Sequence, residues 1–120
     1  MYDGIIIINK EKGYTSHDVV NVVRKTLGMR KVGHTGTLDP EAEGVLPICL
    51  GKGTKVSDML MFSNKKYIAG IKLGVATDTQ DIWGEVIKTS DNAVSREEFE
   101  KVVNSFVGEI TQVTPMYSAI

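Results

Sequence analysis

Apolar residues recur at two different spacings along this chain, and each spacing predicts one kind of element. Residues 4–9 form a short, isoleucine-rich run, which favours a buried β-strand because β-branched side chains suit extended backbone. Residues 17–27 carry apolar side chains at helical spacing, which predicts an amphipathic helix. Its apolar positions are Val19, Val20, Val22, Val23 and Leu27. Thr15 and Ser16 can cap its start, and Gly28 suits the position after its end.

The same two patterns return in the second half of the chain. Behind Thr54, residues 56–62 are apolar at helical spacing, which predicts a short helix capped by that threonine. Residues 65–74 alternate in polarity and predict a strand, with residues 84–88 as its partner. The apolar face of that strand consists of Tyr67, Ala69, Ile71 and Leu73. The polar residues 77–81 predict a turn between the two strands.

A third helix is marked by a local capping signal. Ser95 is followed three residues later by Glu98, the pair that forms a capping box at a helix start. Apolar residues at helical spacing come next, and Gly108 suits the end of the helix. These apolar residues are Phe99, Val102, Val103 and Phe106. Because strands and helices are mixed without a regular strand–helix–strand rhythm, the predicted fold class is α+β.

The stretch 33–51 follows neither pattern, and it holds four of the twelve glycines and two of the three prolines. Glycine permits backbone conformations that other residues avoid, and proline fixes φ. We therefore predict a loop with a defined shape. It carries an acid directly before a proline, Asp39, and an imidazole five residues earlier, His34. Loops of this kind often hold binding and catalytic residues.

Two interpretations of Asp39 stay open on the residues alone. Asp followed by Pro is an ordinary helix start, in which the carboxylate caps the first turn. Against this, Gly44 and Pro47 leave room for barely one helical turn after Asp39. A cap would have little to stabilise there, so a chemical role for the carboxylate gains weight.

Spacing excludes several familiar kinds of site. A phosphate-binding Walker loop needs four residues between its glycine and Gly-Lys, whereas six separate Gly44 from Gly51. The dinucleotide-binding glycine pattern and the Gly-x-Ser-x-Gly elbow of hydrolases do not occur. His17, His34 and Cys49 lack the spacing of a zinc site. We therefore predict no metal site.

Charge is distributed unevenly, although the net charge is only −1. Residues 1–67 hold ten Lys/Arg against seven acids, and residues 68–120 hold four against eight. A polyanionic ligand is therefore expected at the first half. Each lysine around the glycine-rich stretch fits a solvated charge, but together they suit a phosphate backbone. They are Lys10, Lys12, Lys52 and Lys55. Tyr67 fits either a core aromatic or a ring that stacks on a nucleobase.

The cysteine count and the apolar runs indicate the cellular compartment. Cys49 is the single cysteine, which excludes an internal disulfide and fits a reducing cytoplasm. Its apolar neighbours predict a buried, inert thiol. No apolar run approaches the ~20 residues that cross a membrane, and the N-terminus lacks the basic segment of a signal peptide. We expect a cytoplasmic protein without a membrane partner.

At this point the residues resemble one family, the TruB-type tRNA pseudouridine synthases. The resemblance rests first on the blocks GHTGTLDP at 33–40 and GVLPICLG at 44–51, with Thr54 and Lys55. It extends to the opening strand and its basic turn at 4–10. Further matching positions are Lys66, Tyr67, Leu73, Gly74, 77–79, Asp81, Gly84, Gln112, Pro115 and 116–119. It covers essentially all 120 residues.

The resemblance implies an isomerase that converts a T-loop uridine of tRNA into pseudouridine, without a metal or organic cofactor. Asp39 would be the nucleophile, and His34 would press into the T-loop beside the extruded nucleotide. Tyr67 would pack on the target base. Lys10 and Lys55 would lie on the RNA-facing side. Asp81 would orient a catalytic arginine from a later segment.

The resemblance also implies a pseudouridine synthase catalytic domain with a mixed, mainly antiparallel sheet and flanking helices. Residues 1–120 would be its N-terminal part, incomplete, inactive alone and without the C-terminal RNA-binding domain. The full-length protein is expected to be a monomer. Three positions depart from the family pattern: Glu11 stands in place of a proline, Glu43 in place of a small hydroxyl residue, and Thr114 in place of a second proline.

Two other functions stay open beside the enzyme. The basic first half suits an RNA-binding or tRNA-folding module without chemistry. The third interpretation is purely structural, with Asp39 acting only as a helix cap.

Overall fold

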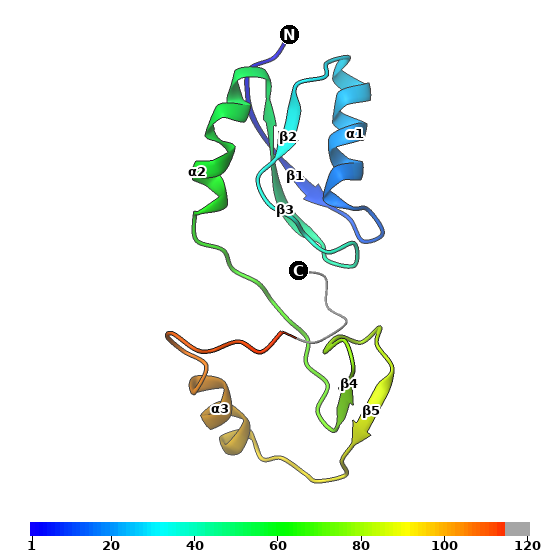
Figure 1. The fold of residues 1–120 in the computed structure, drawn as a ribbon, viewed down its shortest axis with the longest axis vertical. Helices are drawn as coiled ribbons and strands as arrows, with labels where there is room; N and C mark the ends of the chain where they lie inside the picture. Colours follow the sequence, from blue (N-terminus) through cyan, green and yellow to red (C-terminus); the bar gives the residue numbers. More distant parts are fainter. Residues whose placement is uncertain (115–120) are drawn as a thin grey trace. The chain divides into compact units, whose positions relative to one another are not determined.

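The structure is a computed structural model that describes residues 1–114 (Figure 1). The chain forms two compact units, Met1–Tyr67 and Ile68–Ile120. In order, the elements are β1 (Gly4–Lys10), α1 (Ser16–Leu27), β2 (Val32–His34), β3 (Gly44–Leu50), the 3-10 helix η1 (Gly51–Val56), α2 (Ser57–Met61), β4 (Val75–Thr77), β5 (Val86–Thr89) and α3 (Arg96–Asn104). Pro115 and residues 116–119, which entered the family resemblance, lie outside the described residues.

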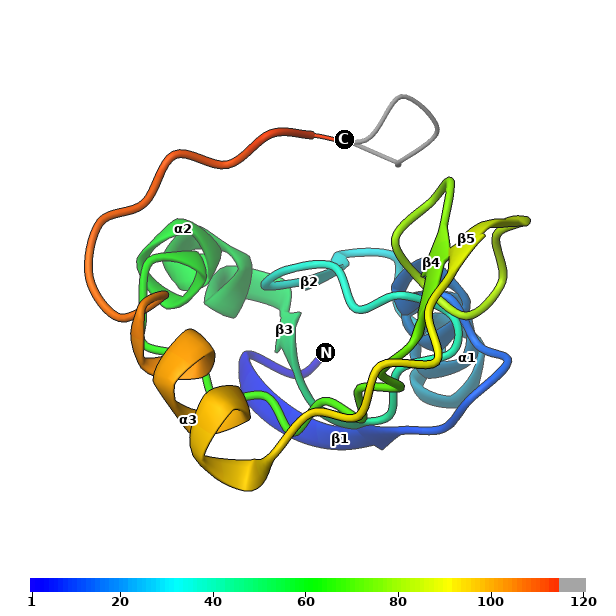
Figure 2. The same cartoon turned by 90° about the horizontal axis from the view of Figure 1, so that it is seen from below.

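The first unit is built on a three-stranded antiparallel sheet. Its strand order is β1-β3-β2, and Figure 2 shows β3 between the other two strands. In the register, Ile8 lies opposite Leu46, and Val32 lies opposite Leu50. The second unit holds a two-stranded antiparallel sheet, β4-β5. The predicted α+β class with antiparallel pairing is confirmed.

Helix α1 supplies the other half of the first unit's core. Val19, Val20 and Val23 are buried with apolar residues of the sheet, as the helical spacing predicted. Val22 is the exception, because it is 54% exposed on the outer side of the helix. The remaining buried members of the core are Met29, Val32, Leu46, Ile48 and Leu50.

Both predicted caps of α1 are present. The Thr15 hydroxyl accepts the Asp18 N–H, and the Asp18 carboxylate accepts the Thr15 N–H, each at 2.9 Å. These two bonds hold the pKa of the Asp18 carboxyl below its ordinary value. Gly28 ends the helix in the left-handed conformation, with φ 62°.

The predicted loop 33–51 is wrong in its second half, because Gly44–Leu50 forms the central strand β3. The proline in this strand is the reason that the sequence favoured a loop. The Pro47 carbonyl accepts the Thr35 N–H at 3.3 Å, on the side of β2 and one residue beyond its end at His34. An N–H at position 47 would point to the same side, beyond the last residue of β2. The lack of this N–H in proline therefore removes no hydrogen bond from within β2.

The predicted cap at Thr54 is also wrong. Thr54 lies inside η1, where its hydroxyl donates to the Gly51 carbonyl at 2.9 Å. Helix α2 begins at Ser57 without a side-chain cap. Its apolar side does not enter the core of the described residues, since Met59 is 74% exposed and Phe62 is 90% exposed.

The predicted strand 65–74 has no partner among residues 1–114. Strand β5 pairs instead with β4, and Val75 lies opposite Thr89. Tyr67, Ile71 and Leu73 are more than half exposed. The alternation of polarity was real, but a strand also needs a neighbour that takes its backbone hydrogen bonds. The predicted turn 77–81 is present from Asp78 onward.

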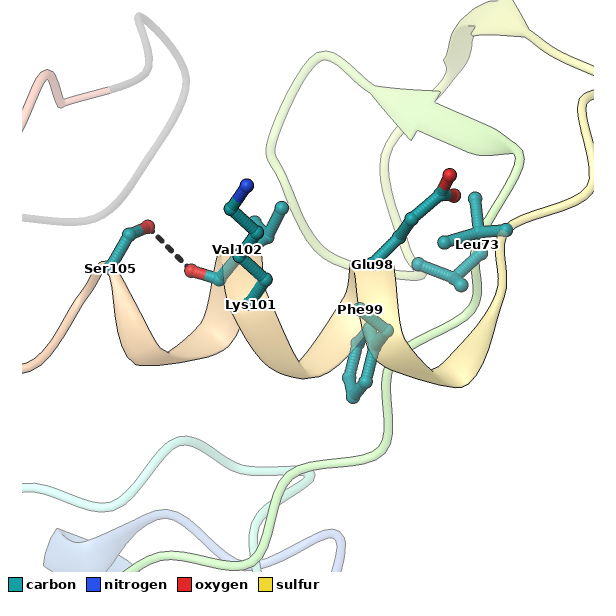
Figure 3. Close-up of a pocket in the computed structure, with 7 residues that line it drawn as sticks. Leu73, Glu98, Phe99, Lys101, Val102 and Ser105 are labelled. Carbon is teal, nitrogen blue, oxygen red and sulfur yellow. Dashed lines mark hydrogen bonds between the residues drawn. The ribbon is translucent and has the colours of Figure 1, made fainter.

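Helix α3 begins as predicted and ends earlier than predicted. The Ser95 hydroxyl accepts the Glu98 N–H at 3.2 Å, which completes the capping box. The helix ends at Asn104, and Gly108 follows after a turn with φ 100°. An open hollow of about 680 Å³ lies along α3 beside Leu73 (Figure 3). Its other lining residues are Val94, Glu98, Phe99, Lys101, Val102 and Ser105.

Cys49 is fully buried on β3, as predicted. Burial raises the pKa of its thiol, because the charged thiolate is disfavoured away from water. None of the helices within residues 1–114 is long and apolar enough to span a membrane.

A glycine substitution in η1 tests the packing of η1 on β1. A Cβ at Gly53 would collide with the Gly4 carbonyl oxygen, and backbone cannot move aside as a flexible side chain can. Gly53→Ala is expected to lower the free energy of unfolding by about 2 kcal/mol in urea titrations followed by circular dichroism.

Gly33→Ala is the matched control, because a Cβ there meets nothing within 4 Å. Its unfolding free energy should stay within about 0.5 kcal/mol of the parent. Equal stability of the two variants would contradict this packing.

Candidate functional site

Asp39 lies in the connection between β2 and β3. The Ala42 N–H donates to the Asp39 carbonyl at 2.9 Å, which closes a β-turn with Pro40 in its second position. No helix begins at this turn within the part of the chain that is described. The interpretation of Asp39 as a helix cap is therefore wrong, and the carboxylate is available for another role.

The residue before Asp39 is anchored to the start of α1. The Ser16 hydroxyl accepts the Leu38 N–H at 2.9 Å and lies 3.3 Å from the Leu38 carbonyl oxygen, to which it donates. Ser16 is 2% exposed, so these bonds are shielded from competing water. One side chain thus satisfies both backbone groups of Leu38.

The residue after Asp39 is anchored to the end of β1. The Pro40 carbonyl accepts the Gly13 N–H at 2.8 Å and the Lys10 ammonium at 3.2 Å. Asp39 therefore stands between two residues whose backbone is fixed from different elements. Such two-sided anchoring restricts the directions in which the carboxylate can point.

Lys10 is buried and supports the Asp39 turn from below. It is 1% exposed, and its ammonium also donates to the carbonyls of Tyr14 at 2.7 Å and Glu11 at 3.0 Å. The prediction of a solvated charge is contradicted by this burial. The RNA-facing role of Lys10 stays a prediction. A buried ammonium is tolerated because three carbonyl oxygens satisfy its three donors.

Asp39 and His34 differ in their surroundings. Asp39 is exposed, and among residues 1–114 no hydrogen-bond partner contacts its carboxylate. His34 is half-buried at the end of β2, and its Nδ1 lies 2.7 Å from the Gly36 carbonyl oxygen. This contact makes Nδ1 the protonated nitrogen and fixes the ring. The proposed insertion of His34 into a T-loop stays a prediction.

Lys55 is not brought to Asp39. Lys55 lies in η1, after the far end of β3, and seven strand residues at ~3.3 Å each separate the two ends by ~20 Å. Tyr67 is 69% exposed at the boundary of the first unit. The roles assigned to these two residues stay predictions.

Asp81 organises the turn between β4 and β5. Its Oδ1 accepts the Thr79 hydroxyl at 2.7 Å and the N–H groups of Trp83 at 2.8 Å and Gly84 at 3.1 Å. The Thr79 hydroxyl, followed by these N–H groups, holds the pKa of Asp81 below its ordinary value. A carboxylate held in its charged form suits the arginine that was predicted as its partner. This pairing stays a prediction.

Sequence reasoning missed two members of this site. Ser16 was considered only as a cap, and no role was predicted for Gly13. Their partners, Leu38 and Pro40, lie more than twenty residues away along the chain, so no local pattern indicates the contacts. An open hollow of about 280 Å³ lies beside Lys10, between β1 and α1, and Asp39 is not among its lining residues.

No group of three or more metal-binding side chains capable of holding an ion occurs within residues 1–114. The site therefore consists of an exposed carboxylate on an anchored turn, with a fixed imidazole on the strand before it.

Comparison with known proteins places this chain in a family. The model of the "TruB family pseudouridylate synthase (N terminal domain)" matches residues 24–120. The chain therefore belongs to the TruB family of pseudouridine synthases.

Several curated relatives are named tRNA pseudouridine synthase B. One from Alkaliphilus oremlandii is 55% identical over 98% of this chain, and one from Clostridium perfringens is 54% identical over 98%. A third, from Geobacillus thermodenitrificans, is 51% identical over 98%. The chain spans about 40% of the length of each of these relatives.

Solved structures agree with the family. The chain resembles one in an H/ACA RNP bound to a substrate RNA containing 2′-deoxyuridine, with a TM-score of 0.63 and 30% identity over 93% of this chain. It also resembles one in a Cbf5-Nop10-Gar1 complex, with a TM-score of 0.65 and 30% identity over 98%. In both cases it covers 30% of the other chain.

Replacement of the buried lysine tests the anchor of the Asp39 turn. Lys10→Met keeps the length of the side chain and removes its donors. Hydrogen bonds to charged groups contribute about 1.5–3 kcal/mol, so the free energy of unfolding is expected to fall by about 2 kcal/mol. Hydrogen exchange of the Gly13 amide, which shares the Pro40 carbonyl with Lys10, should become faster.

Lys12→Met is the matched control, because Lys12 is exposed two residues away. It should change neither quantity. An unfolding free energy for Lys10→Met equal to that of Lys12→Met would show that the ammonium does not hold the turn.

Proposed function

We propose that residues 1–120 are the N-terminal part of the catalytic domain of an enzyme that converts a T-loop uridine of tRNA into pseudouridine. Asp39 is the nucleophile of this reaction. The names of the 50–55% identical relatives support the reaction and the tRNA substrate. The T-loop as the target and a monomeric, cytoplasmic protein are further parts of the proposal.

One observation carries the assignment of Asp39. Its carboxylate is exposed, while Ser16 fixes the preceding residue, and Lys10 with Gly13 fixes the following one. A surface acid that served only solubility would not need a buried ammonium beneath its turn. A nucleophile gains from this arrangement, since a fixed backbone holds it in position for attack.

The chemistry needs one such carboxylate. In the reaction the N1–C1′ bond of the uridine breaks, and a C5–C1′ bond forms. N1 gains a proton, and C5 loses its hydrogen to solvent. A carboxylate can take part by forming a transient covalent bond, which divides the reaction into two easier steps. The target base must leave its stack, and the exposed position of Asp39 suits a base that has been flipped out.

The missing part of the site is proposed to come from later in the longer protein. Asp81, with its charged form stabilised, would pair with an arginine of that part. Tyr67, which is exposed, would stack on the base. The chain alone is therefore expected to be inactive.

A chimaera tests this function with the present residues. It joins residues 1–120 to the remainder of the Alkaliphilus oremlandii relative, which is 55% identical over the shared part. With tRNA that carries tritium at uridine C5, the chimaera should release tritium, and the 120-residue chain alone should not. Asp39→Asn in the chimaera should lower release at least 10⁴-fold, as loss of a nucleophile commonly does, while tRNA binding survives.

Glu41→Gln and Glu43→Gln are the matched controls, because both acids are exposed beside the same turn. They should retain turnover within about threefold, since neither side chain takes part in the two anchors. Turnover by Asp39→Asn at the control rate would remove Asp39 from the chemistry. Absence of turnover in the unsubstituted chimaera would contradict the assignment of these residues to such an enzyme.

An RNA-binding or tRNA-folding module without chemistry is the second candidate. The excess of Lys and Arg in residues 1–67 favours RNA binding. In that case tRNA binding and folding persist in Asp39→Asn, and the unsubstituted chimaera releases no tritium. The same assay therefore separates the two functions.

A further inference from the structure

The turn that joins β4 to β5 presents an exposed tryptophan (Figure 1). Trp83 is 67% exposed, and its neighbour Ile82 is 76% exposed. Tryptophan side chains are on average highly buried in folded proteins. Exposure alone does not single out Trp83, because other apolar side chains of this chain are exposed as well. The turn that carries it is what sets Trp83 apart.

Hydrogen bonds within the turn fix the backbone on both sides of Trp83. Asp81 Oδ1 accepts the N–H groups of Trp83 and Gly84. Asp78 Oδ1 accepts the Glu85 N–H at 2.9 Å, and the Asp78 N–H donates to the Glu85 carbonyl at 3.0 Å. The turn is therefore ordered before any ligand arrives, so that binding costs little further order of the backbone.

Two positions show that the shape of this turn is specified. A Cβ at Gly84 would collide with the Thr79 hydroxyl and the Asp78 carboxylate, so that only glycine fits there. Gln80 adopts φ 64°, a left-handed conformation that is uncommon for a residue other than glycine. Backbone in such sparsely populated conformations gathers at binding and catalytic sites.

The Asp81 carboxylate connects Trp83 with the proposed reaction. Consecutive Cα atoms are 3.8 Å apart, so the Cα atoms of Asp81 and Trp83 lie within ~7.6 Å of each other. An arginine that pairs with Asp81, as proposed above, therefore comes close to Trp83. Because that arginine is proposed to be catalytic, the substrate RNA must also approach this turn.

The acids around Trp83 determine which partner suits the indole. Asp81 lies two residues before Trp83, Glu85 lies two residues after it, and Asp78 is bonded to Glu85. Burial of the indole against an apolar protein surface would also take these carboxylates out of water, which is costly. Phosphate groups would be repelled by the same charges. An uncharged nucleobase can stack on the indole while the carboxylates stay hydrated.

We propose that Trp83 stacks on an unpaired nucleobase in the loop of the substrate RNA that holds the target uridine. This inference rests on the proposed function. Because the acids repel the RNA backbone, a nucleotide meets the turn with its base, and that base must lie outside a duplex. Unpaired loop bases can be splayed out and stacked in this way. Trp83 then holds a base other than the target, for which Tyr67 is proposed.

The test is carried out in the chimaera defined above. Trp83→Ala removes the ring and keeps the backbone N–H that Asp81 accepts. The tRNA Kd should rise about tenfold, within the range that base–aromatic stacking contributes. The slope of log affinity against log salt should not change, because no phosphate contact is lost. Tritium release at saturating tRNA should also stay unchanged, because the stacked base is not the reacting one.

Ile82→Ala is the matched control, because Ile82 is equally exposed in the same turn and has no aromatic ring. Its tRNA Kd should stay within about twofold of the parent. Trp83→Phe keeps a ring and should bind within about threefold of the parent. Thermal melting checks that each variant is folded. Equal losses of affinity in Trp83→Ala and Ile82→Ala would contradict stacking.

A thermodynamic cycle tests whether the partner is a base. Each unpaired base of a T-arm hairpin is replaced in turn by an abasic site, and each hairpin is bound to the parent and to Trp83→Ala. One of these hairpins should show no further loss with Trp83→Ala, because the stacking partner is already absent. A loss of affinity that persists in every hairpin would overturn the proposal and would assign the indole to a contact with protein.

The possible failures are distinguishable. If Trp83→Ala binds tRNA like Ile82→Ala while Asp39→Asn still loses turnover, stacking by Trp83 is contradicted and the proposed function stands. If the cycle identifies a stacked base but the unsubstituted chimaera has no turnover, stacking by Trp83 stands and the proposed function fails.

Discussion

The buried ammonium of Lys10 is the interaction on which the Asp39 turn depends. An ammonium with 1% exposure is costly unless all its donors are satisfied, and here the carbonyls of Glu11, Tyr14 and Pro40 accept them. Burial of Lys10 therefore requires that the folded chain bring these three carbonyls to one point. That point joins the end of β1, the start of α1 and the β2–β3 connection. Ser16 adds the second anchor at Leu38.

This constraint explains why chemistry and charge are separated in the first unit. Lys10 supplies no external positive charge at the Asp39 end, because its ammonium is used internally. The acidic residues therefore determine the net charge of the Asp39 end. Positive charge that could bind a polyanion must come from another surface.

Local signals determined how much could be predicted from the sequence. The N-cap at Thr15, the capping box at Ser95, the strand at β1 and the buried Cys49 each depend on neighbours in sequence, and these were predicted correctly. The predicted burial of β1 is wrong for one of its faces, since Ile5 is 44% and Ile7 is 62% exposed. Strand β3 was missed because a proline in a central strand is tolerated only where the neighbouring strand ends. Here Pro47 lies beyond the end of β2, and this depends on strand pairing that the sequence does not show. The burial of Lys10 and the role of Ser16 depend on residues up to thirty positions away. The sequence motif indicates Asp39 as a candidate site residue, but it does not indicate the contacts that fix the turn around it.

Anchoring of the turn positions the Asp39 carboxylate for reaction, and removal of the Ser16 hydroxyl tests this. Ser16→Ala in the chimaera removes the bonds to Leu38 without touching RNA or Asp39. We expect kcat for tritium release to fall about tenfold and the tRNA Kd to stay unchanged. Ser16→Thr, which keeps the hydroxyl, should restore the rate. An unchanged kcat in Ser16→Ala, with the Leu38 amide exchanging rapidly, would contradict it.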